Sequence, residues 1–437
     1  MEKLTTIKGV HDVYYPESAR WQQIIGITEK VFEDYGYSKI FLPVMEYTEL
    51  FARSIGEDTD IVGKEMYAFK DRKSRDIALR PEGTAGAVRA MIANRQLQGN
   101  IREKIYYFGP MFRYERPQEG RYRQFYQLGC EVFGSRDSET DAEIAEIAVR
   151  VVEECGIKDI TLKINSVGCE DCRKHYRKHL KDALSGCSDE LCEDCNRRLE
   201  TNTLRILDCK NNSCQELYQE TVGGGMNPKN KIKSLSDCLC GNCNQYYGDY
   251  KTSLKERGIE YSEEKKLVRG LDYYTGPVFE LEANGMAVFA GGRYDGLVQK
   301  LGGPDVPACG WALGLERLAA LSGNIEPRKI PEVYLAYLGD IEISSNQPEN
   351  LIREKHIPLC KGLAAKLREK GISVEEDYSC QIPDKKYKMA NKKSVDWMLI
   401  YGTNEAEEKS ISIRNMKTRE EEMISLEDID GIIKRIR

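Results

Sequence analysis

The sequence predicts an α+β protein with a strand-rich main domain, a mostly helical, cysteine-rich insertion and a C-terminal α/β domain. Three observations support this prediction. Segments 104–115 and 125–134 are rich in aromatic and β-branched residues and flank a charged turn, as the strands of a hairpin do. Ten of the 15 cysteines lie between Cys169 and Cys243, which marks a separate segment. After residue 331 strand-like and helix-like segments alternate.

Composition narrows the class of protein. A length of 437 residues suggests two or three domains, and 41% hydrophobic with 31% charged residues is typical of a soluble globular chain. The sequence has no apolar run of roughly 18 residues, so no membrane span is expected. The N-terminus lacks the apolar stretch of a secretory signal. Together with the odd number of cysteines, this predicts a cytoplasmic protein with free or metal-bound thiols.

The formal net charge of -6 argues against a protein that is basic over its whole surface and coats nucleic acid. This net charge does not exclude a local basic groove.

The elements of the main domain follow from periodicity and from turn residues. Apolar residues at helical spacing predict helices over 17–35 and 141–156, each ended by a glycine. Segments 40–45, 159–168, 267–282 and 286–298 are predicted as strands, and 309–321 as a strand or tight turn that runs into a helix. Pro43 places the strand 40–45 at an edge or an interface, because proline cannot donate to a sheet ladder. The predicted domains are 1–168 with 246–325, the insertion 169–245, and 331–437.

The C-terminal domain is predicted from its alternation. Strands are expected at 332–339, 372–378, 396–402 and 410–416, and helices at 359–371 and 385–393. This rhythm indicates a small α/β domain with a largely parallel or mixed sheet.

The charged turn between Phe112 and Glu131 carries the strongest chemical signal. It places Arg113 and Arg121 around a Pro-Gln-Glu-Gly turn with Phe125 beside them. Arginine meets phosphate oxygens with a fixed fork of donors, and an aromatic ring can stack on a base. The turn therefore suits a nucleoside triphosphate, although a surface hairpin with solvated charges would show the same pattern.

Three further motifs add polar groups. The turn at 79–86 projects Glu82 and Thr84 toward a cleft, unless Thr84 serves as a helix N-cap. The segment after Arg269 pairs Tyr273 with Tyr274, as either a ligand wall or core packing. Arg317 lies in the first turn of a helix, where it suits a phosphate tail or is simply solvated.

Six motifs together resemble one family. GYSKIFLPVME, RPEGT, FRYERPQEGRYRQFYQLGCE, RGLDYYTGPVFE, AGGRYDGL and GWALGLERL resemble, in order, the histidyl-tRNA synthetases of the class II aminoacyl-tRNA synthetases. The resemblance runs from about Lys8 to the C-terminus. It implies a class II catalytic domain, an antiparallel sheet with flanking helices, in a homodimer with Pro43 at the interface. It also implies a ligase that makes histidyl-adenylate from histidine and ATP with Mg²⁺ and transfers histidine to tRNA(His).

The resemblance also implies residue roles. For ATP, Arg113 would hold the α-phosphate together with the histidine carboxylate, and Arg269 would assist there as the second catalytic arginine. Phe125 would stack on adenine and Glu115 would contact its amino group. Arg121 and Arg317 would hold the β- and γ-phosphates. The histidine pocket would be formed by Glu82, Thr84, Gln127, Glu131, Tyr273 and Tyr274.

The cysteine spacing indicates a metal. Cys169-x2-Cys172 and Cys192-x2-Cys195 are 19 residues apart, within the range of a four-cysteine zinc site. A second set would then be Cys209, Cys214, Cys240 and Cys243. Reduced, unliganded thiols are the alternative. Because the insertion lies between the class motifs, we expect it to cover the tRNA acceptor stem.

The C-terminal domain resembles the anticodon-binding domain of the histidine, threonine, proline and glycine enzymes. Lys385, Lys388 and Lys392 share one helical face that suits RNA phosphates, although such runs are often only solvated. Two rival functions belong to relatives without ligase activity: the regulatory subunit of ATP phosphoribosyltransferase and a noncatalytic RNA sensor. Both are expected to lose the arginine set, and the regulatory subunit also lacks the C-terminal domain.

Overall fold

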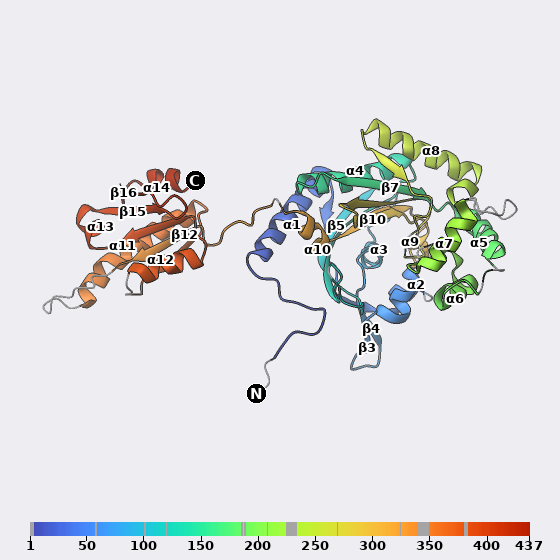
Figure 1. Ribbon diagram of the computed structural model, residues 1–437, viewed down its shortest axis with the longest axis horizontal. Coiled ribbons are helices and arrows are strands. Elements are labelled where there is room, and N and C mark those ends of the chain that lie inside the picture. Colours follow the sequence, from blue (N-terminus) through green and yellow to red (C-terminus); the bar gives the residue numbers. More distant parts are fainter. Residues whose placement is uncertain are drawn as a thin grey trace. The chain divides into compact units, whose positions relative to one another are not determined.

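A computed structural model describes residues 4–56, 59–99, 102–118, 120–184, 187, 189–207, 209–223, 234–268, 270–323, 325–338, 349–379 and 383–437. The chain forms two compact units, Met1–Glu326 and Pro327–Arg437, which are described separately below (Figure 1). Among the described residues, no helix has both the length and the apolar character needed to cross a membrane.

An eight-stranded sheet is the centre of the first unit, in the order β1-β5-β6-β11-β10-β9-β7-β8. Its strands are β1 (Ser38–Lys39), β5 (Glu103–Phe112), β6 (Gln124–Phe133), β7 (Ile160–Ser166), β8 (Tyr261–Glu263), β9 (Pro277–Ala283), β10 (Met286–Arg293) and β11 (Ala308–Gly314). All neighbours pair antiparallel except β1 with β5 and β7 with β8. This sheet with its flanking helices confirms the predicted fold class.

The hairpin β5–β6 shows how the sequence builds two different faces. It pairs from Glu103 with Phe133 to Phe112 with Gln124. Successive side chains of a strand point to opposite faces. On β6, Leu128 and Cys130 therefore enter the core under one helical layer, whereas Gln127 and Glu131 face the other side.

One face of the sheet is covered by a helical layer of α1 (Glu17–Asp34), α4 (Ser138–Glu154), α8 (Gly241–Glu256) and α10 (Leu315–Leu321). Phe32 and Ile147 are fully buried there against Trp311 of the sheet. Asp137 caps α4 by accepting from the backbone amide of Thr140 at 2.8 Å. The helices predicted at 17–35 and 141–156 are present.

The opposite face carries α3 (Thr84–Ala93), with α2 (Thr48–Ile55) and α9 (Leu297–Lys300) beside it. A small antiparallel sheet of β2 (Met45–Tyr47), β4 (Asp76–Leu79) and β3 (Ala68–Lys70) accompanies these helices. Val88 and Met91 of α3 pack against Tyr107 and Phe133 of the hairpin. The N-terminal end of α3 is thereby fixed over the strands.

Three predicted strands of the main domain differ from the structure: 40–45, 267–282 and 286–298, the last of which ends at Arg293. The prediction of a strand over 40–45 is wrong, since β1 ends at Lys39 and β2 begins at Met45. Ile40 still donates its backbone amide to the carbonyl oxygen of Tyr106 at 2.8 Å, but Pro43 has no amide to continue the ladder. Of the segment 267–282, only the part from Pro277 is a strand.

The cysteine-rich segment contributes α5 (Glu170–Leu184), α6 (Glu193–Thr201) and α7 (Asn212–Gly223), with short 3₁₀ turns at Thr203–Ile206 and Ser236–Cys238. A π-helical turn at Ile61–Glu65 belongs to the main domain. The segment has its own small core, in which Tyr176 and Leu180 of α5 contact buried residues of α6 and α7. Its mostly helical character is as predicted.

The second unit contains a five-stranded mixed sheet in the order β13-β12-β14-β15-β16. Its elements are β12 (Val333–Tyr337), α11 (Glu349–Glu369), β13 (Val374–Asp377), α12 (Pro383–Lys392), β14 (Trp397–Tyr401), α13 (Thr403–Glu408), β15 (Ser410–Asn415), β16 (Glu421–Ser425) and α14 (Ile429–Ile436). The strands β13, β12 and β14 run parallel, and β15 and β16 pair antiparallel. The predicted α/β rhythm is confirmed.

Candidate active site

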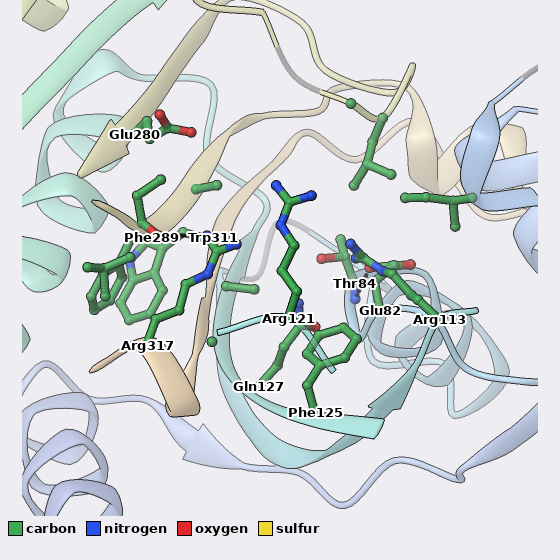
Figure 2. A pocket seen from close by; sticks show the side chains of 18 of the residues that line it. Glu82, Thr84, Arg113, Arg121, Phe125, Gln127, Glu280, Phe289, Trp311 and Arg317 are labelled. Carbon is green, nitrogen blue, oxygen red and sulfur yellow. Dashed lines mark hydrogen bonds between the residues drawn. The ribbon is translucent and has the colours of Figure 1, made fainter. Parts of the chain in front are cut away.

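A cavity of about 260 Å³ opens on the α3 side of the large sheet (Figure 2). Its walls come from β6, the loop between β5 and β6, the strands β9 to β11, and the first turns of α3 and α10. Ten of the predicted site residues line it: Glu82, Thr84, Arg113, Glu115, Arg121, Phe125, Gln127, Tyr273, Tyr274 and Arg317.

Glu131 lies fully buried beneath this cavity and receives three hydroxyl groups. Its Oε1 accepts from Thr84 Oγ1 at 2.7 Å and from Tyr107 Oη at 3.1 Å, and its Oε2 accepts from Tyr294 Oη at 2.5 Å. Burial raises the pKa of Glu131 to about 8, although these hydrogen bonds act in the opposite direction. Burial therefore favours the protonated form of Glu131.

Two glycines make room for this arrangement. Gly310 is opposite Glu131 in the β6–β11 ladder, and a Cβ there would lie 1.7 Å from Glu131 Oε2. Gly129 is opposite Tyr107, and a Cβ there would lie 2.4 Å from the Tyr107 hydroxyl oxygen. No side chain larger than hydrogen fits at either position without moving the buried groups.

Glu82 and Thr84 have roles other than the simple N-cap that the sequence left open for Thr84. Glu82 accepts from the backbone amides of Thr84 at 2.6 Å and Ala85 at 2.9 Å, so its carboxyl group covers the N-terminus of α3. The hydroxyl of Thr84 points instead to Glu131. Burial raises the pKa of Glu82, while the two amides favour its ionised form.

Gln127 offers an unused acceptor. Its Oε1 is buried, and among the described residues it has no hydrogen-bond partner. A buried amide oxygen without a partner is costly, so a ligand that donates a hydrogen bond here gains affinity. The buried ring of Tyr273 lies 5.6 Å from that of Tyr294 and 4.8 Å from that of Tyr274, which closes one wall with aromatic rings.

Three arginines, Arg113, Arg121 and Arg317, also line the cavity. Arg113 is held by its Nε donating to the carbonyl oxygen of Pro81 at 2.9 Å, and its guanidinium lies 5.2 Å from the centroid of Phe125. Arg317 donates from Nη1 to the carbonyl oxygen of Ala287 at 2.8 Å. In Figure 2, Arg121 extends between Arg317 on one side and Arg113 on the other.

The electrostatics of this group favour an anion. Burial lowers the pKa of Arg317, and the charge of Arg121 lowers it further. Glu115 is the nearest carboxylate, with its oxygens 3.9 Å from Arg113 Nη1 and 3.7 Å from Arg121 Nη1. Glu280 also lines the cavity, but Glu115 lies too far from Arg113 and Arg121 for a hydrogen bond. These guanidinium groups therefore keep donors for phosphate oxygens.

Arg269 lies outside the described residues. The loop that follows it is held by the cysteine-rich segment: Asn202 Nδ2 donates to both carboxylate oxygens of Asp272, at 2.9 and 2.7 Å. Arg173 Nη1 donates to the carbonyl oxygen of Tyr274 at 3.0 Å.

The lysine-rich helix α12 of the second unit exposes some of its lysines and buries another. Lys385, Lys388 and Lys392 are exposed along α12. Lys386 is buried instead, with its Nζ 2.7 Å from Asp377 Oδ1. The available basic surface is therefore narrower than the lysine run in the sequence.

The predicted set of metal ligands is wrong in its pairing. Cys169 and Cys172 are not grouped with Cys192 and Cys195; instead, the four Sγ atoms of each of two groups lie within 4.8 Å of one another. One group is Cys169, Cys172, Cys240 and Cys243, and the other is Cys192, Cys195, Cys209 and Cys214. The physical reason is that the start of α8 lies beside the start of α5, although the two are about 70 residues apart in the chain, and sequence spacing does not reveal this contact.

Sequence reasoning missed Tyr107 and Tyr294, both hydrogen-bonded to Glu131, and Glu280, which lines the cavity. The pairing of Tyr107 with Gly129 follows from the hairpin register, so the alternation of β5 held a signal for it. Tyr294 lies within the AGGRYDGL motif, but the local sequence does not reveal its contact with Glu131, because that partner is 163 residues away.

Comparisons with known proteins match one family over nearly the whole chain. A family model described as histidyl-tRNA synthetase matches residues 9–172 and 246–318, and one described as anticodon binding domain matches 334–436. A curated histidine–tRNA ligase of Aquifex aeolicus is 41% identical, over 98% of this chain and 100% of the relative.

Solved structures add two matches. The crystal structure of apo histidyl-tRNA synthetase of S. aureus matches with a TM-score of 0.75 and 31% identity, over 99% of this chain and 100% of that one. A Bacillus halodurans protein, described as an ATP phosphoribosyltransferase regulatory subunit/histidyl-tRNA synthetase, matches with a TM-score of 0.64 over 92% of this chain and 100% of that one. At 18% identity this second match shows the fold alone. On the full-length similarity to the first two proteins and the family match, this chain belongs to the histidyl-tRNA synthetase family.

Proposed function

We propose that this chain ligates histidine to tRNA(His), through a histidyl-adenylate made from histidine and ATP. The observation that carries this proposal is the combination of buried Glu131, under a polar pocket, with three arginines in the same cavity. The polar pocket above Glu131 suits a small polar amino acid, and the three arginines suit a phosphate chain.

The histidine pocket would consist of Glu82, Thr84, Gln127, Glu131, Tyr273 and Tyr274. Glu131 would accept from an imidazole N–H, and the free Oε1 of Gln127 would accept from another donor of the substrate. A pocket of this kind rejects an analogue that leaves its buried polar groups unpaired, which a purely apolar pocket cannot do.

The ATP site would be formed by the loop and by α10. Phe125 would stack on adenine and Glu115 would contact its amino group. Arg113 would contact the α-phosphate, and Arg121 and Arg317 the β- and γ-phosphates. Glu280 is a carboxylate that lines the same cavity, and it would hold a Mg²⁺ ion that shields the phosphate charge.

The reaction requires positioning and charge stabilisation more than acid–base chemistry. A carboxylate oxygen of histidine attacks the α-phosphorus, and the bond to the bridging oxygen breaks as pyrophosphate leaves. Arg113 and Arg269 would together stabilise the charge on the α-phosphoryl oxygens. A ribose hydroxyl of the terminal adenosine of tRNA then attacks the histidyl carbonyl carbon, and AMP leaves.

The second unit, together with the exposed lysines of α12, would bind the anticodon region of tRNA. We also propose the domain division 1–168 with 246–325, 169–245 and 331–437, with the insertion over the acceptor stem. In support, the match to the anticodon-binding model begins at residue 334, and the synthetase model skips 173–245.

A homodimer is supported by exposed apolar side chains around Pro43. Phe41 is 81% exposed, and Met45, Tyr47 and Phe69 are exposed nearby in sequence or sheet. Monomeric proteins rarely leave such a group uncovered. A cytoplasmic location is supported by the thiols, since fourteen described cysteines are free.

ATP–pyrophosphate exchange, measured with each amino acid in turn, tests the proposal. We expect exchange with histidine alone, followed by charging when tRNA is added. Both rival functions, the regulatory subunit and the RNA sensor, predict no exchange with any amino acid.

A further inference from the structure

Eight cysteines of the 169–245 segment form two compact groups. The neck cluster, Cys169, Cys172, Cys240 and Cys243, joins the start of α5 to the start of α8. The outer cluster, Cys192, Cys195, Cys209 and Cys214, joins the start of α6 to the loop and first turn of α7. Figure 1 shows α5, α6 and α7 gathered at one side of the sheet, beside α8.

The sulfur separations fit a shared ion better than a covalent bond. Cys169 Sγ lies 3.5 Å from Cys172 Sγ, and Cys192 Sγ lies 3.8 Å from Cys209 Sγ. A disulfide requires about 2.05 Å. Four thiolates arranged tetrahedrally at about 2.3 Å from a zinc ion are about 3.8 Å apart.

The backbone around both clusters favours thiolates. Cys192 and Cys240 are the N-cap residues of α6 and α8, and their partners three residues later lie in the first helical turn. Helix N-termini carry partial positive charge that stabilises an anionic sulfur.

Backbone amides also donate to the sulfurs. The amide of Cys240 donates to Cys172 Sγ at 3.2 Å, and the amide of Cys192 donates to Cys214 Sγ at 3.2 Å. The amide of Asn211 donates to Cys209 Sγ at 3.4 Å. Hydrogen bonds of this kind orient metal ligands and disperse their charge.

We propose that the neck cluster and the outer cluster each bind one Zn²⁺ through four cysteine thiolates. Zinc takes four thiolates in closed, structural sites, and the thiol protons are released on binding. Because all four Sγ atoms of a cluster lie within 4.8 Å of one another, each site holds a single ion and lacks the room for an iron–sulfur cluster. With four protein ligands no position is left for substrate, so both ions are structural.

The two ions would stiffen the elements that hold the proposed histidine pocket. Arg173 follows Cys172 on α5 and donates from Nη1 to the carbonyl oxygens of Gly168 and Tyr274, both at 3.0 Å. Asn202, at the end of α6, holds Asp272. The effect of zinc on the histidine pocket rests on the proposed function, whereas zinc binding by the cysteines does not. The two statements can therefore be contradicted separately.

Metal content of the purified full-length protein is the first test. We expect native mass spectrometry and elemental analysis to give two zinc ions per chain after expression in zinc-supplemented medium. Co²⁺ exchanged for zinc should give the absorption of tetrahedral thiolate sites. A chain with fewer than two tightly bound ions, or with iron in these sites, would overturn the proposal.

Double variants test which cysteines share an ion. C172S/C243S removes two ligands of the neck cluster and should leave one zinc, whereas C172S/C195S damages both clusters and should leave none. The pairing expected from spacing alone predicts the reverse. C187S, a cysteine of the same segment outside both clusters, should keep two zinc ions. If a double variant fails to fold, the cobalt spectrum and zinc count of the unaltered chain still decide whether two four-thiolate sites exist.

Discussion

The hydroxyl of Tyr294 donates to Oε2 of Glu131 across 2.5 Å, and both side chains are buried. Tyr294 directly follows β10 and Glu131 lies on β6, two strands that are separated in the sheet by β11. Together with the hydroxyls of Thr84 and Tyr107, this contact makes Glu131 the point where three parts of the catalytic unit meet.

The raised pKa of Glu131 predicts a pH-dependent stability. Between its usual value near 4.5 and about 8, the folded chain keeps a proton that the unfolded chain releases. The free energy of unfolding of the ligand-free protein therefore falls as pH rises through this window, by up to about 1.4 kcal/mol per pH unit from this group.

Glu131→Gln removes this titration and retains the shape of the side chain. Urea unfolding at pH 5, 7 and 9 should show the variant gaining stability relative to the parent chain as pH rises. Glu82 and Glu316 also have raised pKa values, but they are present in both proteins and cancel in the difference. Parallel pH profiles of the two proteins would count against a neutral Glu131.

Gly310→Ala should disturb the same carboxyl group from the opposite strand. The new Cβ would lie 1.7 Å from Glu131 Oε2, so Glu131 must move. We expect a loss of about 1–3 kcal/mol in unfolding free energy and a KM for histidine raised at least tenfold. Gly26→Ala on α1 is the control, because a Cβ there contacts nothing within 4 Å and should stabilise the helix by about 1 kcal/mol. Unchanged histidine kinetics in G310A would contradict the geometry.

Asn202→Ala tests whether the cysteine-rich segment supports the pocket. Without the two hydrogen bonds from Nδ2, the carboxylate of Asp272 loses its anchor, and the loop carrying Tyr273 and Tyr274 loosens. The KM for histidine should rise several-fold, which is less than the tenfold or more expected for a lost hydrogen bond to a charged group of the substrate, because Asn202 acts through the loop. The KM for ATP should change less. Thr201→Ala removes a hydroxyl that donates to the carbonyl oxygen of Arg197 within α6, and it should behave as the parent chain does.

The exposed face of α12 predicts a salt-sensitive contact with RNA. Changing Lys385, Lys388 and Lys392 to Ala should weaken tRNA binding and lower the slope of log affinity against log salt by about 2. Pyrophosphate exchange should stay unchanged, because the reaction occurs in the other unit. A matched control replaces three exposed lysines of other elements of the same unit, Lys366, Lys370 and Lys434. Equal losses in both triple variants would show a general charge effect only.

The sequence predicted those features that depend on local pattern. The aromatic and β-branched residues of 104–115 and 125–134, around a charged turn, predicted the hairpin, and the motifs around Arg113, Gln127 and Tyr273 predicted residues that line one cavity. The segment 40–45 shows the limit of this reasoning. Its apolar residues predicted a strand, but Pro43 has no backbone N–H and cannot continue the hydrogen-bond ladder.

Features that depend on distant chain segments could not be predicted. The zinc-ligand pairing failed because Cys169 meets Cys240 and Cys243 only when α8 returns to the sheet. The contact of Tyr294 with Glu131 was missed for the same reason, since the hydroxyl donates to Glu131 across β11. Lys386 belongs to the same lysine-rich stretch as Lys385 and Lys388, but it is buried and pairs with Asp377 at the end of β13, which the local sequence does not show.

The central claim is that the single β5–β6 hairpin, with its loop, serves both substrates: Arg121 in the loop for ATP and Gln127 on β6 for histidine. Both side chains are suitable for substitution, because Arg121 lies 3.7 Å from the carboxylate of Glu115, too far for a hydrogen bond, and Oε1 of Gln127 has no partner among the described residues. The decisive measurement is the pair of KM values in ATP–pyrophosphate exchange for Arg121→Ala and Gln127→Leu. We predict that Arg121→Ala raises the KM for ATP at least tenfold and leaves that for histidine within about twofold, and that Gln127→Leu does the opposite. Two variants that raise the KM of the same substrate, or of neither, would contradict the account.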